Sequence, residues 1–87
     1  MEKDRHQIKN LFVEILKKYA KDPSLFENLN DNTEIIKDLK INSARIVDIT
    51  LDIEEALDIE LDDNDMDALF TIGESIDTIE KLVKAKT

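Results

Sequence analysis

A chain with a single glycine and a single proline in 87 residues has few of the residues that usually build turns, so most of it is expected to form regular structure. Its apolar residues recur at helical spacing, and the apolar-polar alternation typical of strands is absent. The length suits one small domain, residues 1–87. The sequence therefore predicts an all-α fold, a four-helix bundle with three long helices and one short helix.

Apolar spacing and end signals place the helices. The long helices are expected over about residues 4–20, over residues 43–57, and from Thr71 onward, where Thr71 and Glu74 suggest a capping box. Residues 63–69 suit one short helical turn. The buried stripe of the second helix is expected to comprise Ile46, Ile49, Ile53, Ala56 and Leu57.

Residues 22–42 form a long connection between the first two helices. A structureless loop of this length is unusual in a compact domain and is often functional. Six apolar residues are expected to hold it on the core: Leu25, Phe26, Leu29, Ile35, Leu39 and Ile41.

Composition excludes several classes of protein. There is no cysteine, which excludes disulfides, thiolate zinc sites and a cysteine nucleophile. No apolar run approaches the roughly 20 residues of a membrane span. The N-terminus is charged and lacks the apolar core of a signal peptide, so a cytoplasmic location is expected.

The net charge of −9 is concentrated in one half of the chain. Residues 1–42 hold eight acidic and eight basic residues, whereas residues 43–80 hold thirteen acidic residues and one base, Arg45. Such a surface repels nucleic acid and anionic membranes and attracts basic proteins.

Ser43 stands at the start of the second helix, directly after the long connection, where its hydroxyl is expected to be exposed. A phosphate attached there would lie near unpaired N–H groups and the positive end of the helix dipole. The alternative is that Ser43 or Asn42 serves only as the helix N-cap, which is a common use of both residue types.

Residues 35–43 resemble the attachment motif of the acyl carrier protein family, in which an apolar residue precedes Asp-Leu-Gly and Asp-Ser-Leu. The likeness continues through the acidic residues 52–61 and the helix that starts with residues 71–79. With the first helix, it covers nearly the whole chain and implies an acyl-carrier-like fold.

The resemblance implies a carrier and not an enzyme. A phosphopantetheinyl transferase would attach 4′-phosphopantetheine covalently to Ser43, beside Asn42, and the arm's thiol would carry acyl groups as thioesters. Acyl-transferring and acyl-modifying enzymes with basic docking patches would recognise the second helix of a monomeric carrier. The expected docking residues are Ala44, Val47, Asp48, Leu51, Asp52, Glu54 and Glu55.

Four positions depart from the family motif. Lys40 stands in place of glycine, Asn42 in place of aspartate and Ala44 in place of leucine, and Arg45 is positive where the family is commonly acidic or neutral. These departures favour a specialised lipid or secondary-metabolite pathway over housekeeping fatty acid biosynthesis. An amino-acid or peptidyl carrier shares the serine arrangement.

Two alternatives belong to other classes. Asp63, Asp65, Asp67 and Glu74 have the spacing of an EF-hand calcium loop, although Ala68 stands where that loop needs glycine, so a weak metal site or a non-covalent acidic interaction domain is the second hypothesis. A small enzyme is the third, and a Ser-His-Asp catalytic centre would need His6 to fold back beside Ser43.

Overall fold

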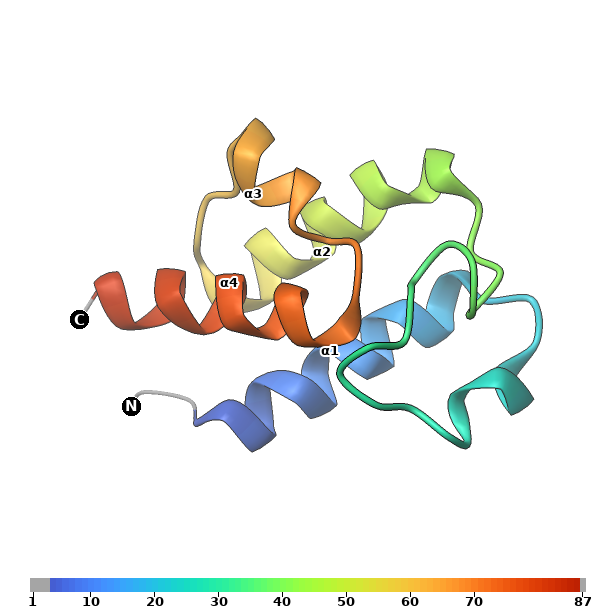
Figure 1. Cartoon of the computed structure of the whole chain (residues 1–87). Helices are drawn as coiled ribbons and strands as arrows, with labels where there is room; N and C mark the ends of the chain where they lie inside the picture. The colour runs from blue at the N-terminus through green and yellow to red at the C-terminus, as the bar shows by residue number, and fades with distance from the viewer. Residues whose placement is uncertain (1–3, 87) are drawn as a thin grey trace.

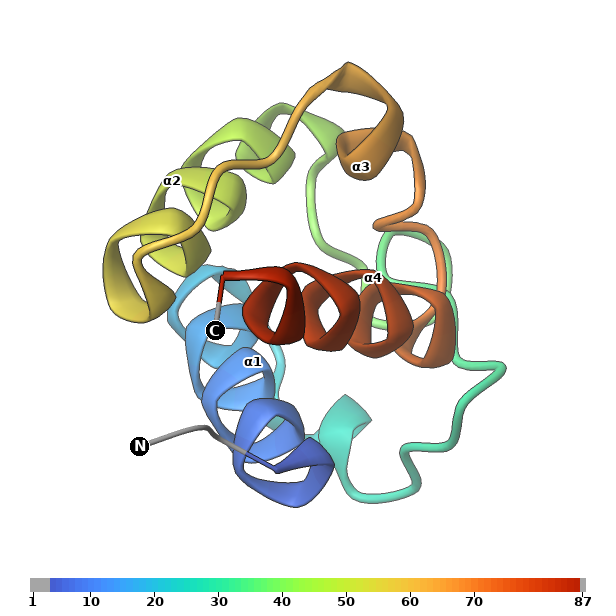
Figure 2. The same cartoon turned by 90° about the vertical axis from the view of Figure 1, so that its left-hand side faces the viewer.

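The computed structural model describes residues 4–86. Four α-helices follow one another, α1 (Arg5–Tyr19), α2 (Ile46–Leu57), α3 (Asp63–Asp67) and α4 (Ile72–Ala85), with short 3₁₀ turns η1 (Pro23–Phe26) and η2 (Ser43–Arg45) before α2. In Figure 1, α1 runs away from the end that holds both termini, and α2 and α4 run back toward it. Figure 2 shows α3 between α2 and α4, on the side away from α1. The all-α prediction, with three long helices and one short helix, is confirmed.

The ends of α1 follow from its sequence. The Asp4 carboxylate accepts a hydrogen bond from the Gln7 N–H at 2.9 Å, and the Gln7 side chain accepts one from the Asp4 N–H at 3.0 Å. This reciprocal capping box satisfies two of the N–H groups that a helix start leaves unpaired. The helix ends before Pro23, because the residue preceding a proline avoids the α region.

The second helix begins later than predicted. Residues Ser43–Arg45 form a 3₁₀ turn, and the α-helix proper starts at Ile46. The predicted stripe is buried at Ile49, Ile53 and Leu57, but Ile46 is only half-buried and Ala56 is exposed, so its assignment to the core was wrong.

The start of α4 also differs from prediction. The Thr71 hydroxyl accepts a hydrogen bond from the Glu74 N–H at 3.2 Å, as expected of an N-cap. Within residues 4–86 no bond returns from the Glu74 side chain to Thr71, so only half of the capping box forms. Instead Thr71 pairs with Glu34 in an isolated antiparallel bridge that ties the long connection to α4.

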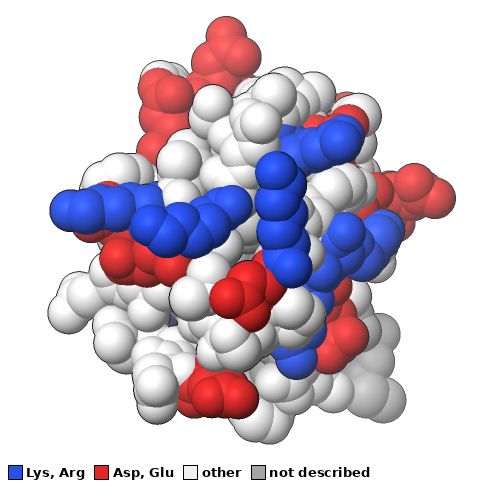
Figure 3. All heavy atoms as spheres, turned by 90° about the vertical axis from the view of Figure 1, so that its right-hand side faces the viewer, with Lys and Arg blue, Asp and Glu red and all other residues white. Residues whose placement is uncertain are grey.

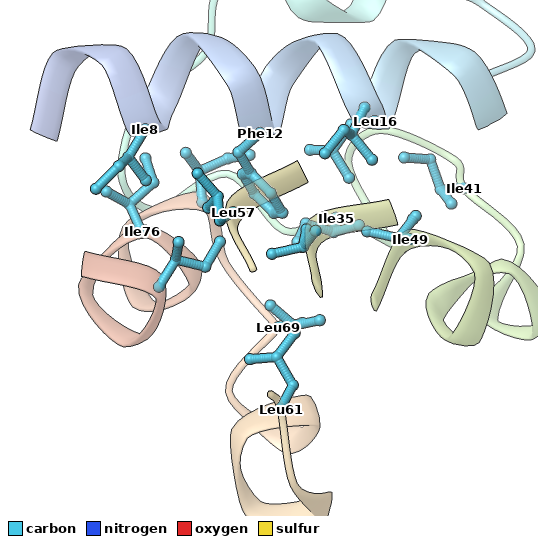
Figure 4. Packing of buried hydrophobic residues seen from close by; sticks show 14 of the residues in the cluster. Ile8, Phe12, Leu16, Ile35, Ile41, Ile49, Leu57, Leu61, Leu69 and Ile76 are labelled. Carbon is cyan, nitrogen blue, oxygen red and sulfur yellow. The ribbon is translucent and has the colours of Figure 1, made fainter. Parts of the chain in front are cut away.

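The long connection is held on the core as predicted. Phe26, Ile35, Leu39 and Ile41 are buried, and Leu25 and Leu29 pack against the same cluster. Figure 4 shows side chains from α1, such as Phe12 and Leu16, facing Ile35 of the connection and Ile49 of α2. Burying a side chain of this size contributes about 1.5–3 kcal/mol. The connection is therefore a fixed part of the bundle.

The single glycine marks a close approach between this connection and α4. The Gly73 N–H donates to the Asp31 carbonyl at 2.9 Å, and a Cβ at Gly73 would lie 2.8 Å from the Asp31 Cβ and 3.0 Å from its carbonyl oxygen. Both distances are shorter than ordinary contacts, and one of the opposing atoms belongs to the backbone.

We expect Gly73→Ala to destabilise the fold by about 1–2 kcal/mol, because the overpacking outweighs the better helix propensity of alanine. Urea denaturation measures the loss. The double variant Gly73→Ala/Asp31→Gly, compared with Asp31→Gly alone, should show a smaller loss, because one of the two opposing atoms is gone. An equal loss in both backgrounds would show that the Asp31 Cβ is not the obstacle.

Candidate functional site

The approach to Ser43 alternates between buried and exposed residues. Leu39 and Ile41 are 0% and 1% exposed, whereas Lys40, Asn42 and Ser43 are exposed. The two buried side chains fix the chain on the core just before α2. Ser43 is consequently presented to solvent from a firmly held segment, as the sequence predicts.

The hydroxyl of Ser43 is not used as a helix cap. The Asn42 side chain accepts the capping hydrogen bond from the Ala44 N–H at 2.9 Å, and the Arg45 N–H donates to the Asn42 carbonyl at 2.8 Å. The choice between Asn42 and Ser43 as N-cap is thus resolved in favour of Asn42. The Ser43 side chain remains available for chemistry.

The other two serines of the chain are committed to local hydrogen bonds. The Ser75 hydroxyl is buried and donates to the Thr71 carbonyl at 2.7 Å, and the Ser24 hydroxyl donates to the Asp22 carboxylate at 2.6 Å. Among the residues that the structure describes, Ser43 is the serine whose hydroxyl is exposed and makes no hydrogen bond.

Lys40 has a left-handed backbone, with φ of 57°. This conformation costs a residue other than glycine about 1–2 kcal/mol. Lys40 lies between buried Leu39 and buried Ile41. The left-handed conformation explains why glycine suits this position in the acyl carrier protein motif, because glycine adopts it without that steric cost.

Basic side chains gather next to Ser43. Lys18, Lys21, Lys40 and Arg45 line a surface hollow of about 570 Å³, together with Asn42. Figure 3 shows lysine and arginine side chains clustered on the face that carries the end of α1 and the start of α2. The sequence did not predict this hollow. Its lysines come from α1 and from the connection, and residues 1–42, which include both segments, hold equal numbers of acidic and basic residues.

The predicted apolar docking residues are exposed. Val47 and Leu51 are 54% and 56% exposed, and Ala44 is exposed beside Ser43. Large apolar side chains that remain in solvent along one side of a helix mark a surface suited to contact with another protein.

The predicted acidic docking residues form more hydrogen bonds and ion pairs within the chain than the sequence indicated. The Asp52 carboxylate accepts hydrogen bonds from the Tyr19 hydroxyl at 2.6 Å and from the Lys18 ammonium at 2.9 Å. Asp48 pairs with Arg45 at 3.2 Å, and the Glu54 carboxylate accepts from the Leu61 N–H at 2.8 Å.

Three of the four acids therefore have partners within the chain. Glu55 is exposed and forms no ion pair within 4.0 Å among residues 4–86.

The residues of the two alternative hypotheses lie elsewhere. Asp63, Asp65 and Asp67 belong to α3, where the Asp65 side chain closes a capping box with Asp62 instead of contributing to a calcium loop. Within residues 4–86 no group of three or more His, Asp or Glu side chains is placed to hold a metal ion. His6 lies in the first turn of α1, and its ring contacts Asn10 at 3.3 Å, at the opposite end of α1 from the connection that leads to Ser43 (Figure 1).

The hydrogen bonds to Asp52 from Tyr19 and Lys18, in that order of size, lower the pKa of its carboxyl. A lowered carboxyl pKa stabilises the fold fully above the unfolded value of about 3.9, and this stabilisation is lost as pH falls through the folded pKa.

Replacing Tyr19→Phe should therefore raise the pKa of Asp52 toward that ordinary value, and Lys18→Gln should raise it as well. Carboxyl ¹³C NMR titration measures the pKa of each variant. The stability difference between wild type and Tyr19→Phe should shrink as pH falls below about 4. An unchanged Asp52 pKa in Tyr19→Phe would contradict this assignment.

Lys40→Gly should stabilise the protein by about 1 kcal/mol, because glycine adopts the left-handed conformation without steric cost. Lys37→Gly is the matched control: it removes the same charge from the same connection, but Lys37 has a negative φ. That control should lose about 0.5–1 kcal/mol through the greater flexibility of the unfolded chain. Thermal or urea unfolding compares the two, and a destabilised Lys40→Gly would refute the strain.

Comparison with known proteins adds independent information. No model of a protein family matches the chain. The chain is 30% identical over 77 residues to the mitochondrial acyl carrier protein of Saccharomyces cerevisiae, which covers 86% of this chain and 62% of the relative. It is 30% identical over 53 residues to the acyl carrier protein of Thermotoga maritima, covering 61% of this chain and 65% of the relative.

The chain thus matches just under two thirds of the length of each of these relatives. Both carry the same family name, and the helical bundle agrees with it. By sequence, the chain is thus similar to acyl carrier proteins over most of its own length.

Proposed function

We propose that the chain is an acyl carrier protein that carries acyl groups as thioesters on a 4′-phosphopantetheine arm attached to Ser43. The observation that carries this proposal is the exposed Ser43 hydroxyl, which makes no hydrogen bond, at the end of an anchored connection. Similarity to the two acyl carrier proteins supports the carrier role.

The attachment step needs little from this chain beyond accessibility. The Ser43 oxygen would form a bond to the phosphorus that bears the pantetheine of coenzyme A. The phosphoanhydride bond would break, adenosine 3′,5′-bisphosphate would leave, and the hydroxyl proton would pass to a base of the transferase. Asn42 contributes by capping the turn, which leaves the Ser43 hydroxyl unbonded.

On this proposal the chain is not an enzyme, and other proteins perform the chemistry. Both relatives are named as carriers. The single histidine lies at the far end of α1, so the site offers Ser43 no histidine base (Figure 1). The thiol that holds the acyl group would belong to the arm, since the chain has no cysteine.

The exposed side of α2 is the proposed landing surface for the phosphopantetheinyl transferase and for acyl-transferring and acyl-modifying enzymes. Ala44, Val47 and Leu51 would make apolar contacts, and Glu55 would attract basic patches. Asp48, Asp52 and Glu54 would add to this field, although each also holds a partner within the chain. Steering of this kind speeds encounter without demanding tight binding, which suits a shuttle.

The pathway and the cellular location of the carrier are also part of the proposal. The departures at Lys40, Asn42, Ala44 and Arg45 favour a specialised lipid or secondary-metabolite pathway. None of the helices within residues 4–86 has the length and hydrophobicity that a bilayer span requires. The cytoplasmic location stays a prediction, because one relative is named as mitochondrial.

Incubation with coenzyme A, magnesium and a broad-range phosphopantetheinyl transferase should add one phosphopantetheine per chain, as measured by intact mass. Ser43→Ala should gain none. Ser24→Ala, which removes the other exposed serine hydroxyl, should gain one like the wild type. A wild-type protein that several transferases leave unmodified, or a Ser43→Ala variant that is still modified, would overturn the proposal.

A further inference from the structure

The hollow beside Ser43 is a positive site on a strongly negative protein. Four cations line it in a chain of net charge −9. Lys18 is paired with Asp52 and Arg45 with Asp48, so two of the four charges are balanced locally. Lys21 and Lys40 have no ion-pair partner within 4.0 Å among residues 4–86. The hollow therefore has an excess of positive charge that nothing in the described chain neutralises.

The departures from the family motif coincide with this hollow. Lys40 in place of glycine, Asn42 in place of aspartate and Arg45 in place of an acidic or neutral residue all line it. The first two replacements each make it more positive by one charge, and Arg45 adds another relative to a neutral residue. Lys40 does so despite a left-handed backbone that glycine would adopt without steric cost.

The hollow also offers a neutral donor next to Ser43. The Asn42 side-chain oxygen Oδ1 accepts the capping bond, and the side-chain N–H₂ group makes no hydrogen bond within residues 4–86. An aspartate at this position would cap the turn equally well but would repel an anion. Asn42 precedes Ser43 directly and Arg45 follows two positions later, so a group attached to the Ser43 oxygen starts close in sequence to two lining residues.

We propose that this hollow binds the phosphodiester of the group attached to Ser43, through Lys21, Lys40, Arg45 and the Asn42 amide. This inference rests on the proposed function and deepens it. A phosphodiester carries one negative charge and four oxygens that accept hydrogen bonds, which matches two unpaired ammonium groups and an amide. The root of the arm is thereby held against the end of α1, and the exposed apolar side of α2 stays open to partner enzymes.

The test uses modified protein and ³¹P NMR of the phosphodiester at low salt. In the wild type the ³¹P resonance should differ from that of the same protein unfolded in urea, and the Lys21 and Lys40 amides should shift between unmodified and modified protein. The double variant Lys21→Gln/Lys40→Gln should move the ³¹P resonance most of the way to the unfolded position. Glutamine keeps the backbone cost at residue 40, so folding is not altered by relief of strain.

The matched control is Lys9→Gln/Lys81→Gln, which removes the same charge from distant parts of α1 and α4 and should leave the ³¹P resonance at the wild-type position. If the modified wild type and both modified double variants have the same ³¹P resonance, this inference is overturned and the carrier function still stands. A double variant that only raises the KM of the transferase, with no ³¹P change, overturns it in favour of an acidic patch on the partner. Absence of the mass gain would overturn the carrier function itself and this inference with it.

Discussion

Burial of Leu39 and Ile41 in the core is the constraint on which the rest of the site depends. These two side chains hold the connection at the point where it meets α2, and each contributes about 1.5–3 kcal/mol through burial. The backbone between them is left-handed at Lys40. The residues that follow are then directed to solvent, and Asn42 supplies the cap that leaves Ser43 unbonded.

The charge of α2 is divided between its two ends. Basic residues surround its start, whereas Glu54, Glu55, Asp58 and Glu60 line a hollow of about 730 Å³ at its other end. Leu51 belongs to the acidic hollow and is exposed. On the proposed function, a partner enzyme would meet apolar contacts and negative charge away from the attachment serine, and positive charge close to it.

Much of the fold could be predicted from the sequence, because it follows from local signals. Helical spacing gave α1 and α4 and the buried Ile49 and Ile53, and the anchors of the long connection were confirmed. The burial of Ala56 and the α-helical first turn of α2 were wrong. A small apolar side chain carries little information about which face it occupies. The first turn after the Asn42 cap is closed by i→i+3 hydrogen bonds, such as that from the Arg45 N–H to the Asn42 carbonyl.

The charge interactions of the site were harder to predict from the sequence. The bonds from Lys18 and Tyr19 to Asp52 join residues 34 and 33 positions apart, and no local pattern encodes them. The basic hollow has the same origin, since it brings the end of α1 next to residues 40–45. By contrast, exposure of Ser43 was predictable, because the residue stands at the start of a helix directly after the anchored connection.

The intact mass of the protein purified from its native cells, followed by peptide mapping, tests the central claim most directly. The account predicts that the peptide containing Ser43 carries a single phosphopantetheine, with or without an acyl group on its thiol. A native protein that is unmodified throughout, or that carries the group on a different residue, would contradict it.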